Sequence, residues 1–232
     1  MKNIFTFYIL LLLGFFLNAQ NLKSPDNNLD LNFSIDEKGR AFYSLNFHDK
    51  PVILNSGLGF MLKDNVEWMK IDTLDMMNNF KILNVTFDSV DEYWNPVWGE
   101  ESEIRNNYNE MFVELQQIES ERKVNIRFRL FDDSLGFRYE FPLQEKLGSF
   151  IIIDEKTEFA MAGDHTAMWI PGDYDTQEYN YTTSKLSEIE QKSIEFKEEN
   201  VSMYRFSNWA VQTALMMKSQ NGLYINIHEA AL

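Results

Sequence analysis

The chain has 232 residues, of which 44% are hydrophobic and 25% are charged, and this balance excludes an intrinsically disordered chain. Its 36 acidic side chains outnumber 21 lysines and arginines, and the net charge of -15 makes binding to nucleic acid or to an anionic membrane surface unfavourable. The absence of cysteine excludes disulfides, thiolate metal sites and a cysteine nucleophile.

The first residues have the pattern of a signal peptide. Lys2 precedes an almost wholly apolar run from Ile4 to Leu17, shorter than the roughly 20 residues that a helix needs to span a bilayer. Ala19 offers a small residue at a plausible cleavage point, with an uncleaved anchor as the alternative. We therefore expect a signal peptide over residues 1–19 and an exported, periplasmic chain that makes no membrane contact after cleavage.

Alternation of apolar and polar residues predicts strands along most of the remaining chain. It is clear over Leu29–Ile35 and again over Ala41–Phe47, which are separated by a short polar turn. In Lys123–Leu130 every second residue is apolar, so one face of this strand must be buried. Met111–Ile118 before it and Phe137–Phe141 after it complete a predicted three-stranded meander.

The C-terminal part contains a predicted hairpin and little helix. Val211–Lys218 and Leu223–His228 flank a turn with Asn-Gly, a pair that accommodates positive φ. Ser187–Glu199 is charged and predicts a solvated excursion or a short surface helix. Many short strands without a βαβ rhythm predict an all-β fold, a large antiparallel sandwich over residues 20–232. Because Leu232 follows an apolar strand without a turn or polar tail, we expect this domain to continue beyond it.

The three histidines lack the spacing of a self-contained zinc site. His48 lies in a predicted surface turn, His165 follows a loop, and His228 stands beside Glu229 near the predicted last strand. No Gly-x-Ser-x-Gly elbow supports a serine nucleophile, although a Ser-His-Asp triad stays possible. Neither a phosphate-binding glycine loop nor a dinucleotide fingerprint occurs, which argues against kinases and dehydrogenases.

The segment 169–181 combines acidic and aromatic residues. After Trp169, a Pro-Gly turn is followed by Asp173, Asp175 and Glu178, with three tyrosines between and after them. Oxygen ligands suit calcium, and rings beside hydrogen-bonding groups suit sugars. On residue types alone, an acidic turn with structural tyrosines is the stronger interpretation.

A second segment of this kind extends over residues 93–110. It contains Trp94, Trp98, Glu101 and further acids and amides, and we read it as one loop. The segment predicts a polar and aromatic surface, with the alternative that both tryptophans fill the core.

At these two segments the sequence resembles glycoside hydrolase family 97, the exported α-glucosidases and α-galactosidases of Bacteroidetes-type bacteria. Asn107 departs from the family pattern, where a histidine is expected in the string Arg-Asn-His-Tyr-Asn. The other matching segments occur in family order and are closest to the α-glucosidase branch. They are Ser24–Leu29, Pro96–Glu101, Ile104–Asn106, Phe128–Phe131, Leu135–Pro142, Trp169–Asp175 and Tyr224–Leu232.

The resemblance implies a three-part enzyme of which this chain matches the first part. That part is a β-super-sandwich related to galactose mutarotase, followed in the family by a (β/α)₈ barrel and a C-terminal β domain. The catalytic carboxylates lie in the barrel, so no catalytic residue is expected here. Glu178 falls on the position that ligates a calcium ion, whose other ligands come from the barrel. A single carboxylate cannot supply about six to eight oxygen ligands, so we expect weak calcium binding by this chain alone.

The expected partners are therefore an α-linked oligosaccharide and the catalytic barrel of the same polypeptide. Residues from the acidic, aromatic and C-terminal segments are the candidates for sugar contact, namely Trp98, Glu101, Trp169, Asp173, Asp175, His228 and Glu229. Two alternatives stay open: a free-standing carbohydrate-binding or scaffold module, and a mutarotase-like epimerase that uses His165 or His228 as acid or base.

Overall fold

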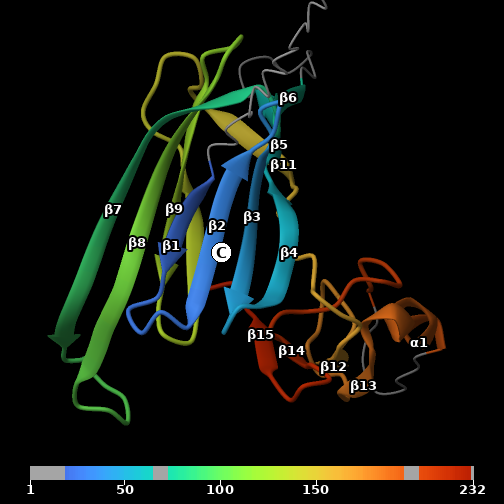
Figure 1. Ribbon diagram of the computed structural model, residues 1–232. Coiled ribbons are helices and arrows are strands. Elements are labelled where there is room, and N and C mark those ends of the chain that lie inside the picture. Colours follow the sequence, from blue (N-terminus) through green and yellow to red (C-terminus); the bar gives the residue numbers. More distant parts are fainter. Residues whose placement is uncertain (1–18, 65–72, 196–203, 231–232) are drawn as a thin grey trace, which may run out of the picture. The chain divides into compact units, whose positions relative to one another are not determined.

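The structure, a computed structural model, describes residues 19–64, 73–195 and 204–230 and divides the chain into two compact units (Figure 1). Unit 1 extends to Ala160 and unit 2 begins at Met161. The predicted signal peptide lies almost entirely outside the described residues, so it and the predicted domain limits stay predictions. No helix among the described residues is long and apolar enough to cross a membrane.

Unit 1 consists of strands joined by short turns. They are β1 (Gln20–Lys23), β2 (Leu29–Ile35), β3 (Ala41–Phe47), β4 (Lys50–Leu58), β5 (Phe60–Asp64), β6 (Thr73–Met76), β7 (Phe80–Trp94), β8 (Ile104–Gln117), β9 (Lys123–Leu130), β10 (Leu135–Glu140) and β11 (Phe150–Glu155). Every pairing between them is antiparallel, in sheets of order β1-β2-β3-β4, β10-β9-β8-β7 and β11-β5-β6. The all-β, antiparallel prediction is confirmed.

Two of these sheets face each other and enclose an aromatic core. The alternating burial of β2, β3 and β9 places every second side chain between the sheets, because successive residues of a strand point to opposite faces. Phe33 of β2 and Tyr43 of β3 meet Phe128 of β9, with ring centroids 5.8 and 6.5 Å apart, and Phe137 of β10 lies 5.8 Å from Phe128. Figure 1 shows β2 and β3 in one layer and β8 and β9 in the other.

The predicted meander is confirmed, although its first strand is longer than predicted. The strand predicted over Met111–Ile118 begins at Ile104. It pairs with β7 over its whole length, from Phe80↔Gln117 to Trp94↔Ile104, whereas its pairing with β9 starts only at Asn109. The hairpin of β7 and β8 thus continues as two strands beyond the end of β9. The prediction of one loop over 93–110 is wrong, because period-two alternation continues on both sides of a shorter loop, 95–103.

Unit 2 contains a small four-stranded antiparallel sheet and a short helix. The strands are β12 (Thr166–Trp169), β13 (Thr182–Lys185), β14 (Leu215–Lys218) and β15 (Tyr224–Ile227), in the order β13-β12-β14-β15. The predicted hairpin of β14 and β15 is confirmed, and Gly222 in its turn has φ 87°, a conformation that glycine adopts without steric cost. The predicted surface helix consists of a 3₁₀ turn, Leu186–Glu188, and α1 (Ile189–Glu195), with 196–199 outside the described residues.

The packing of unit 1 predicts a large effect at Phe128. This ring has no exposed surface and contacts three other aromatic rings, so Phe128→Ala leaves a cavity between the sheets and should lower the free energy of unfolding by about 3–5 kcal/mol. Leu143→Ala is the control, because Leu143 is fully exposed and its change should stay within about 0.5 kcal/mol. Urea unfolding followed by near-UV circular dichroism measures both, and equal effects would contradict the described core.

Candidate functional site

The acidic segment of unit 2 is paired along its length with a later stretch of the chain, residues 204–212. The amide of Gly172 donates to the carbonyl of Ala210 at 2.8 Å, and the amide of Phe206 donates to the carbonyl of Gly172 at 2.9 Å. At the two ends, the amides of Gln212 and Tyr174 donate to the carbonyls of Ile170 and Tyr204. Glycine is required at 172, because a Cβ there would lie 2.8 Å from the Cβ of Ala210. A ladder of backbone hydrogen bonds to residues 204–212 therefore holds the acidic turn in place.

Asp173 fastens the same two segments through its carboxylate. Its Oδ1 accepts hydrogen bonds from the amides of Asp175 and Thr176, at 2.8 and 3.2 Å. Its Oδ2 accepts from the hydroxyl of Tyr179 at 2.6 Å and from the amide of Tyr204 at 2.7 Å. Burial acts to raise the pKa of Asp173, but these donors outweigh it and hold the pKa below its ordinary value. Both oxygens are occupied, so the predicted sugar contact of Asp173 gives way to a structural function.

The other two carboxylates of the segment are exposed. Asp175 and Glu178 project from the turn, and neither makes a side-chain hydrogen bond or ion pair with a described residue. Among the described residues no three acidic or histidine side chains come close enough to hold a metal ion. Glu178 is thus placed as a single oxygen donor at a surface, and the side chains around it in the described chain do not complete a calcium site.

Four exposed aromatic rings stand on the paired segments in one continuous row, which we call the aromatic shelf: Tyr204, Tyr174, Phe206 and Trp209. Their exposed fractions are 58–65%. The ring of Tyr174 lies 5.4 Å from that of Tyr204 and 5.8 Å from that of Phe206, between centroids, and Phe206 lies 6.3 Å from Trp209. Sequence reasoning named none of these four residues as a site residue, although Tyr174 lies in the acidic and aromatic segment that it singled out. The three aromatic residues within 204–209 were a signal, but only the pairing with residues 170–174 brings them to Tyr174.

Trp169, a predicted sugar contact, lies in the core instead. It is the last residue of β12 and has no exposed surface, and its indole Nε1 donates to the hydroxyl of Ser184 at 3.0 Å. It packs with Ala167, Ile189 and Met217. The prediction of sugar contact is wrong for this arrangement, because the alternation of β12 turns the ring inward and the sugar has no access to it.

The tip of the β7–β8 hairpin carries the second candidate surface. Trp98 is 90% exposed and Trp94 is 48% exposed, which excludes the alternative that these tryptophans fill the core. Glu101 is exposed in the same loop. The hairpin belongs to unit 1, so the structure itself does not join Trp98 and Glu101 to the acidic turn of unit 2.

The histidines are placed in different surroundings. His228 and Glu229 are exposed just after β15, and their predicted sugar contact stays a prediction. His165 is 7% exposed, and its Nε2 is buried without a hydrogen-bond partner among the described residues. A substrate has no direct access to His165, which weakens the epimerase alternative for this residue.

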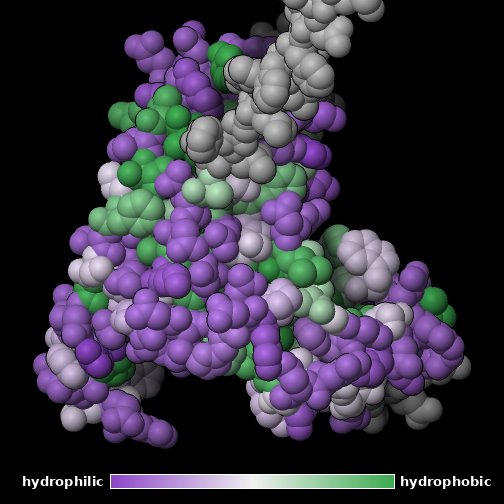
Figure 2. Space-filling model, viewed as in Figure 1, coloured by the Kyte–Doolittle hydropathy of each residue, from purple (hydrophilic) through white to green (hydrophobic). Residues whose placement is uncertain are grey.

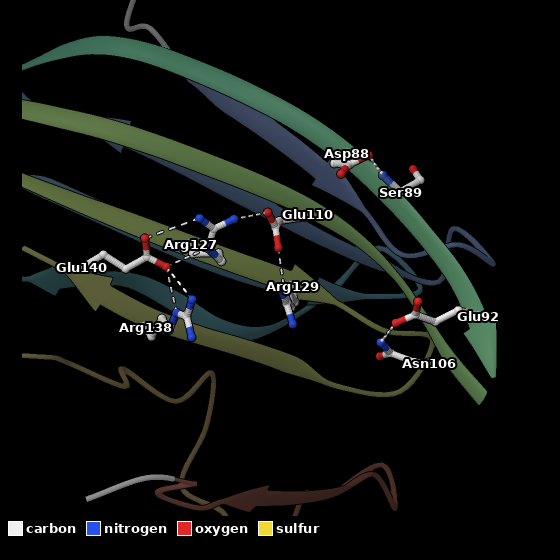
Figure 3. A network of polar contacts seen from close by, with 9 residues as sticks. All are labelled: Asp88, Ser89, Glu92, Asn106, Glu110, Arg127, Arg129, Arg138 and Glu140. Atoms are coloured by element: carbon white, nitrogen blue, oxygen red, sulfur yellow. Dashed lines mark hydrogen bonds and ion pairs between the residues drawn. The ribbon is translucent and has the colours of Figure 1, made fainter. Parts of the chain in front are cut away.

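The outer face of unit 1 carries a row of ion pairs between glutamates and arginines (Figure 3). These pairs compensate the burial of the Glu110 carboxylate. Glu110 of β8, 8% exposed, accepts from Arg127 and from Nε of Arg129 at 2.8 Å, and Arg127 also donates to Glu140 at 2.7 Å. Arg138 donates to the same oxygen of Glu140. The bonds from Arg127, with those from Arg138, lower the pKa of Glu140 against the opposing effect of burial. Ionised at neutral pH and fully paired, Glu140 is unsuited to act as a general acid.

Comparison with known proteins identifies the family of this fold. The family described as "Glycosyl-hydrolase 97 N-terminal" matches residues 22–232. A retaining alpha-galactosidase of Bacteroides thetaiotaomicron is 25% identical over 187 residues, which is 75% of this chain and 25% of that protein. The chain spans about a quarter of the length of the relatives that it matches.

Solved structures show the same relationship. A Glycoside Hydrolase Family 97 enzyme from Pseudoalteromonas sp. strain K8, solved with panose and with acarbose, is 33% identical with TM-scores of 0.73 and 0.74. The match covers 92% of this chain and 28% of that one. A beta-arabinopyranosidase at 19% identity and a TM-score of 0.68 shares the fold, over 92% of this chain and 32% of its own.

The bonds of Asp173 predict a pH-dependent loss of stability. In Asp173→Asn one oxygen becomes an NH₂ group that cannot accept from Tyr179 or Tyr204, so the free energy of unfolding should fall by about 1–2 kcal/mol at pH 7. Because the folded-state pKa is lowered, the wild-type advantage is present above the unfolded pKa of about 3.9 and disappears as the pH falls through the folded value.

Urea titrations of both proteins from pH 7 to pH 2.5 measure this difference. Asp175→Asn, at an exposed carboxylate of the same turn, is the control and should change stability little at any pH. A difference between wild type and Asp173→Asn that persists unchanged at pH 2.5 would refute the assignment to the ionised carboxylate.

Proposed function

The chain belongs to the glycosyl-hydrolase 97 N-terminal family, and we propose that it serves as the N-terminal domain of a calcium-dependent α-glycosidase. In this proposal Glu178 donates one oxygen ligand to a calcium ion, and a catalytic domain outside this sequence donates the others. The domain also forms one wall of the sugar pocket. Hydrolysis itself is the work of the other domain.

The placement of Glu178 is the observation that carries the proposal. Its carboxylate is exposed and makes no hydrogen bond or ion pair with another described residue, yet its turn is fixed by Asp173 and by the ladder to residues 204–212. A free ligand on a fixed turn loses little conformational entropy when it binds, which favours a site shared between two domains.

When bound, calcium would supply positive charge that orients and stabilises oxygen atoms of the substrate. The residues of this chain do the positioning. Asp173 holds the turn, and Glu178 is presented to the ion. In this proposal the catalytic carboxylates belong to the other domain, so this chain alone should be inactive.

An α-glucoside is the substrate that we favour. The relative solved with panose and acarbose is 33% identical to this chain, whereas the curated alpha-galactosidase is 25% identical. Trp98, Glu101, Asp175, His228 and Glu229 are exposed and stay candidates for sugar contact. Export to the periplasm through a signal peptide over residues 1–19 belongs to the same proposal.

The calcium assignment is tested by Glu178→Gln in the complete polypeptide that carries this domain. The amide is isosteric but uncharged, so the dissociation constant for Ca²⁺, measured by competition with a fluorescent chelator, should rise at least about tenfold. Hydrolysis of an aryl α-glucoside should fall at limiting Ca²⁺ and recover as Ca²⁺ is added.

Glu190→Gln is the matched control, because Glu190 is an exposed glutamate on α1 of the same unit. It should leave calcium affinity unchanged. An unchanged affinity in Glu178→Gln would refute the ligand assignment, and glucose release from maltotriose by the purified 232-residue chain above a blank would refute the division of labour.

A further inference from the structure

The aromatic shelf has no function in the calcium proposal, although it stands on the paired segments that hold the acidic turn of unit 2. Each of its rings is more than half exposed, and each contacts the next. Exposed apolar surface of this extent, bordered by polar groups, marks an interaction site more often than it occurs by chance. The question is which ligand fits it.

The shelf is prearranged rather than loose. The amide of Tyr174 donates to the carbonyl of Tyr204 at 3.0 Å, and the amide of Tyr204 is fixed by Asp173. Phe206 is bonded through its amide to Gly172, and the ring contacts add further stabilisation. Tyrosine and tryptophan also lose little side-chain entropy on binding. The rings are thus ready to receive a ligand without rearrangement.

The chemistry of the shelf favours a neutral ligand with both apolar and hydroxyl groups. The phenol hydroxyls of Tyr174 and Tyr204 make no hydrogen bond with a described residue, so both can bond a ligand. The carboxylate of Asp175 arises from the same turn and can accept from hydroxyl groups. The net charge of -15 disfavours an anionic ligand, and the mainly hydrophilic face of the molecule seen in Figure 2 disfavours a lipid surface.

From these observations we propose that the aromatic shelf is a carbohydrate-binding subsite of this chain, which stacks two or more pyranose units of an α-linked oligosaccharide on Tyr174, Tyr204, Phe206 and Trp209. The sugar C–H faces cover the rings, and the sugar hydroxyls bond the tyrosine hydroxyls and the carboxylate of Asp175 at the border. This subsite rests on the proposed function for its substrate class, but it needs neither calcium nor the catalytic domain.

The orientation of the rings sets the expected length of the ligand. Successive rings are 5.4–6.3 Å apart and tilted by 45–84° to each other, so one sugar unit cannot cover them all. A trisaccharide should therefore bind more tightly than a disaccharide, and glucose least. Because the shelf is open to solvent, binding should be weak, with a dissociation constant on the order of 1 mM.

The test is a calorimetric titration of the full chain with panose and maltotriose in the presence of EDTA, with cellotriose as the β-linked comparison. We expect saturable binding of the two α-linked sugars and at least fivefold weaker binding of cellotriose. Trp209→Ala and Tyr174→Ala should each weaken binding of panose about five- to tenfold, because each removes one stacking face, and Trp209→Phe should retain most of the affinity.

Tyr224→Ala is the matched control. Tyr224 is 60% exposed in the same unit, but it lies on β15 outside the shelf, with Lys218 over its ring at 5.0 Å. Circular dichroism checks that each variant is folded. Equal losses in Tyr224→Ala and Trp209→Ala, or the absence of saturable binding, would overturn the proposal. So would self-association, measured by analytical ultracentrifugation, that depends on the shelf while no sugar binds, since the shelf would then be a protein contact.

The titration separates this proposal from the calcium role of Glu178. EDTA removes calcium, and Glu178→Gln in this chain should leave panose affinity within about threefold of wild type. Failure of the shelf variants to weaken binding contradicts the subsite alone, whereas an unchanged calcium affinity of Glu178→Gln in the complete polypeptide contradicts the metal site alone.

Discussion

The arrangement of the acidic turn and the aromatic shelf in unit 2 depends on the hydrogen bonds that the ionised carboxylate of Asp173 accepts. This carboxylate accepts four hydrogen bonds, two from its own turn, one from Tyr179 and one from the returning segment at Tyr204. Backbone bonds and the side chain of Gln212, which donates to the carbonyl of Thr176 at 2.7 Å, also join the turn that presents Glu178 to the stretch that carries most of the aromatic shelf. Asp173 adds a charge-assisted acceptor at this junction, and it thereby helps to fix the relative placement of an oxygen ligand and a row of rings.

Some carboxylates of the described chain are paired with arginines, whereas others are exposed and unpaired. The two kinds are suited to different roles, the first to stabilising the fold and the second to binding a ligand. In unit 1, Glu110 and Glu140 form an alternating row of ion pairs with three arginines on the outer face of the sheet. In unit 2, Asp175 and Glu178 are exposed and unpaired among the described residues. Exposed, unpaired carboxylates keep both oxygens available for a metal ion or a sugar hydroxyl, and the candidates Asp175 and Glu178 are of this kind.

Local patterns were enough to predict several of the strands, those whose alternation of apolar and polar residues is clear because one face is buried. Lys123–Leu130 is β9, and the Asn-Gly hairpin forms as predicted. The site was harder to predict. Trp169 stands in an acidic, aromatic segment that suggests ligand contact, but its position on β12 turns it into the core. The shelf joins residues some 30 positions apart in sequence, and such a pairing follows from tertiary structure rather than from any local pattern.

Under the proposed function, Glu178 is the one calcium ligand that this chain contributes, and this has a thermodynamic consequence. If its oxygen and those of another domain share one calcium ion, the free energy of metal binding also stabilises the docking of the two domains, and docking raises calcium affinity by the same factor. A complete metal site within one domain would bind the ion whether or not the domains were assembled. A site divided between two domains binds the ion tightly only in the assembled enzyme. Tight calcium binding is thereby coupled to assembly of the site where the sugar is cleaved. A shelf that binds sugar without calcium would then act before this step, holding an oligosaccharide near the turn while assembly completes the site.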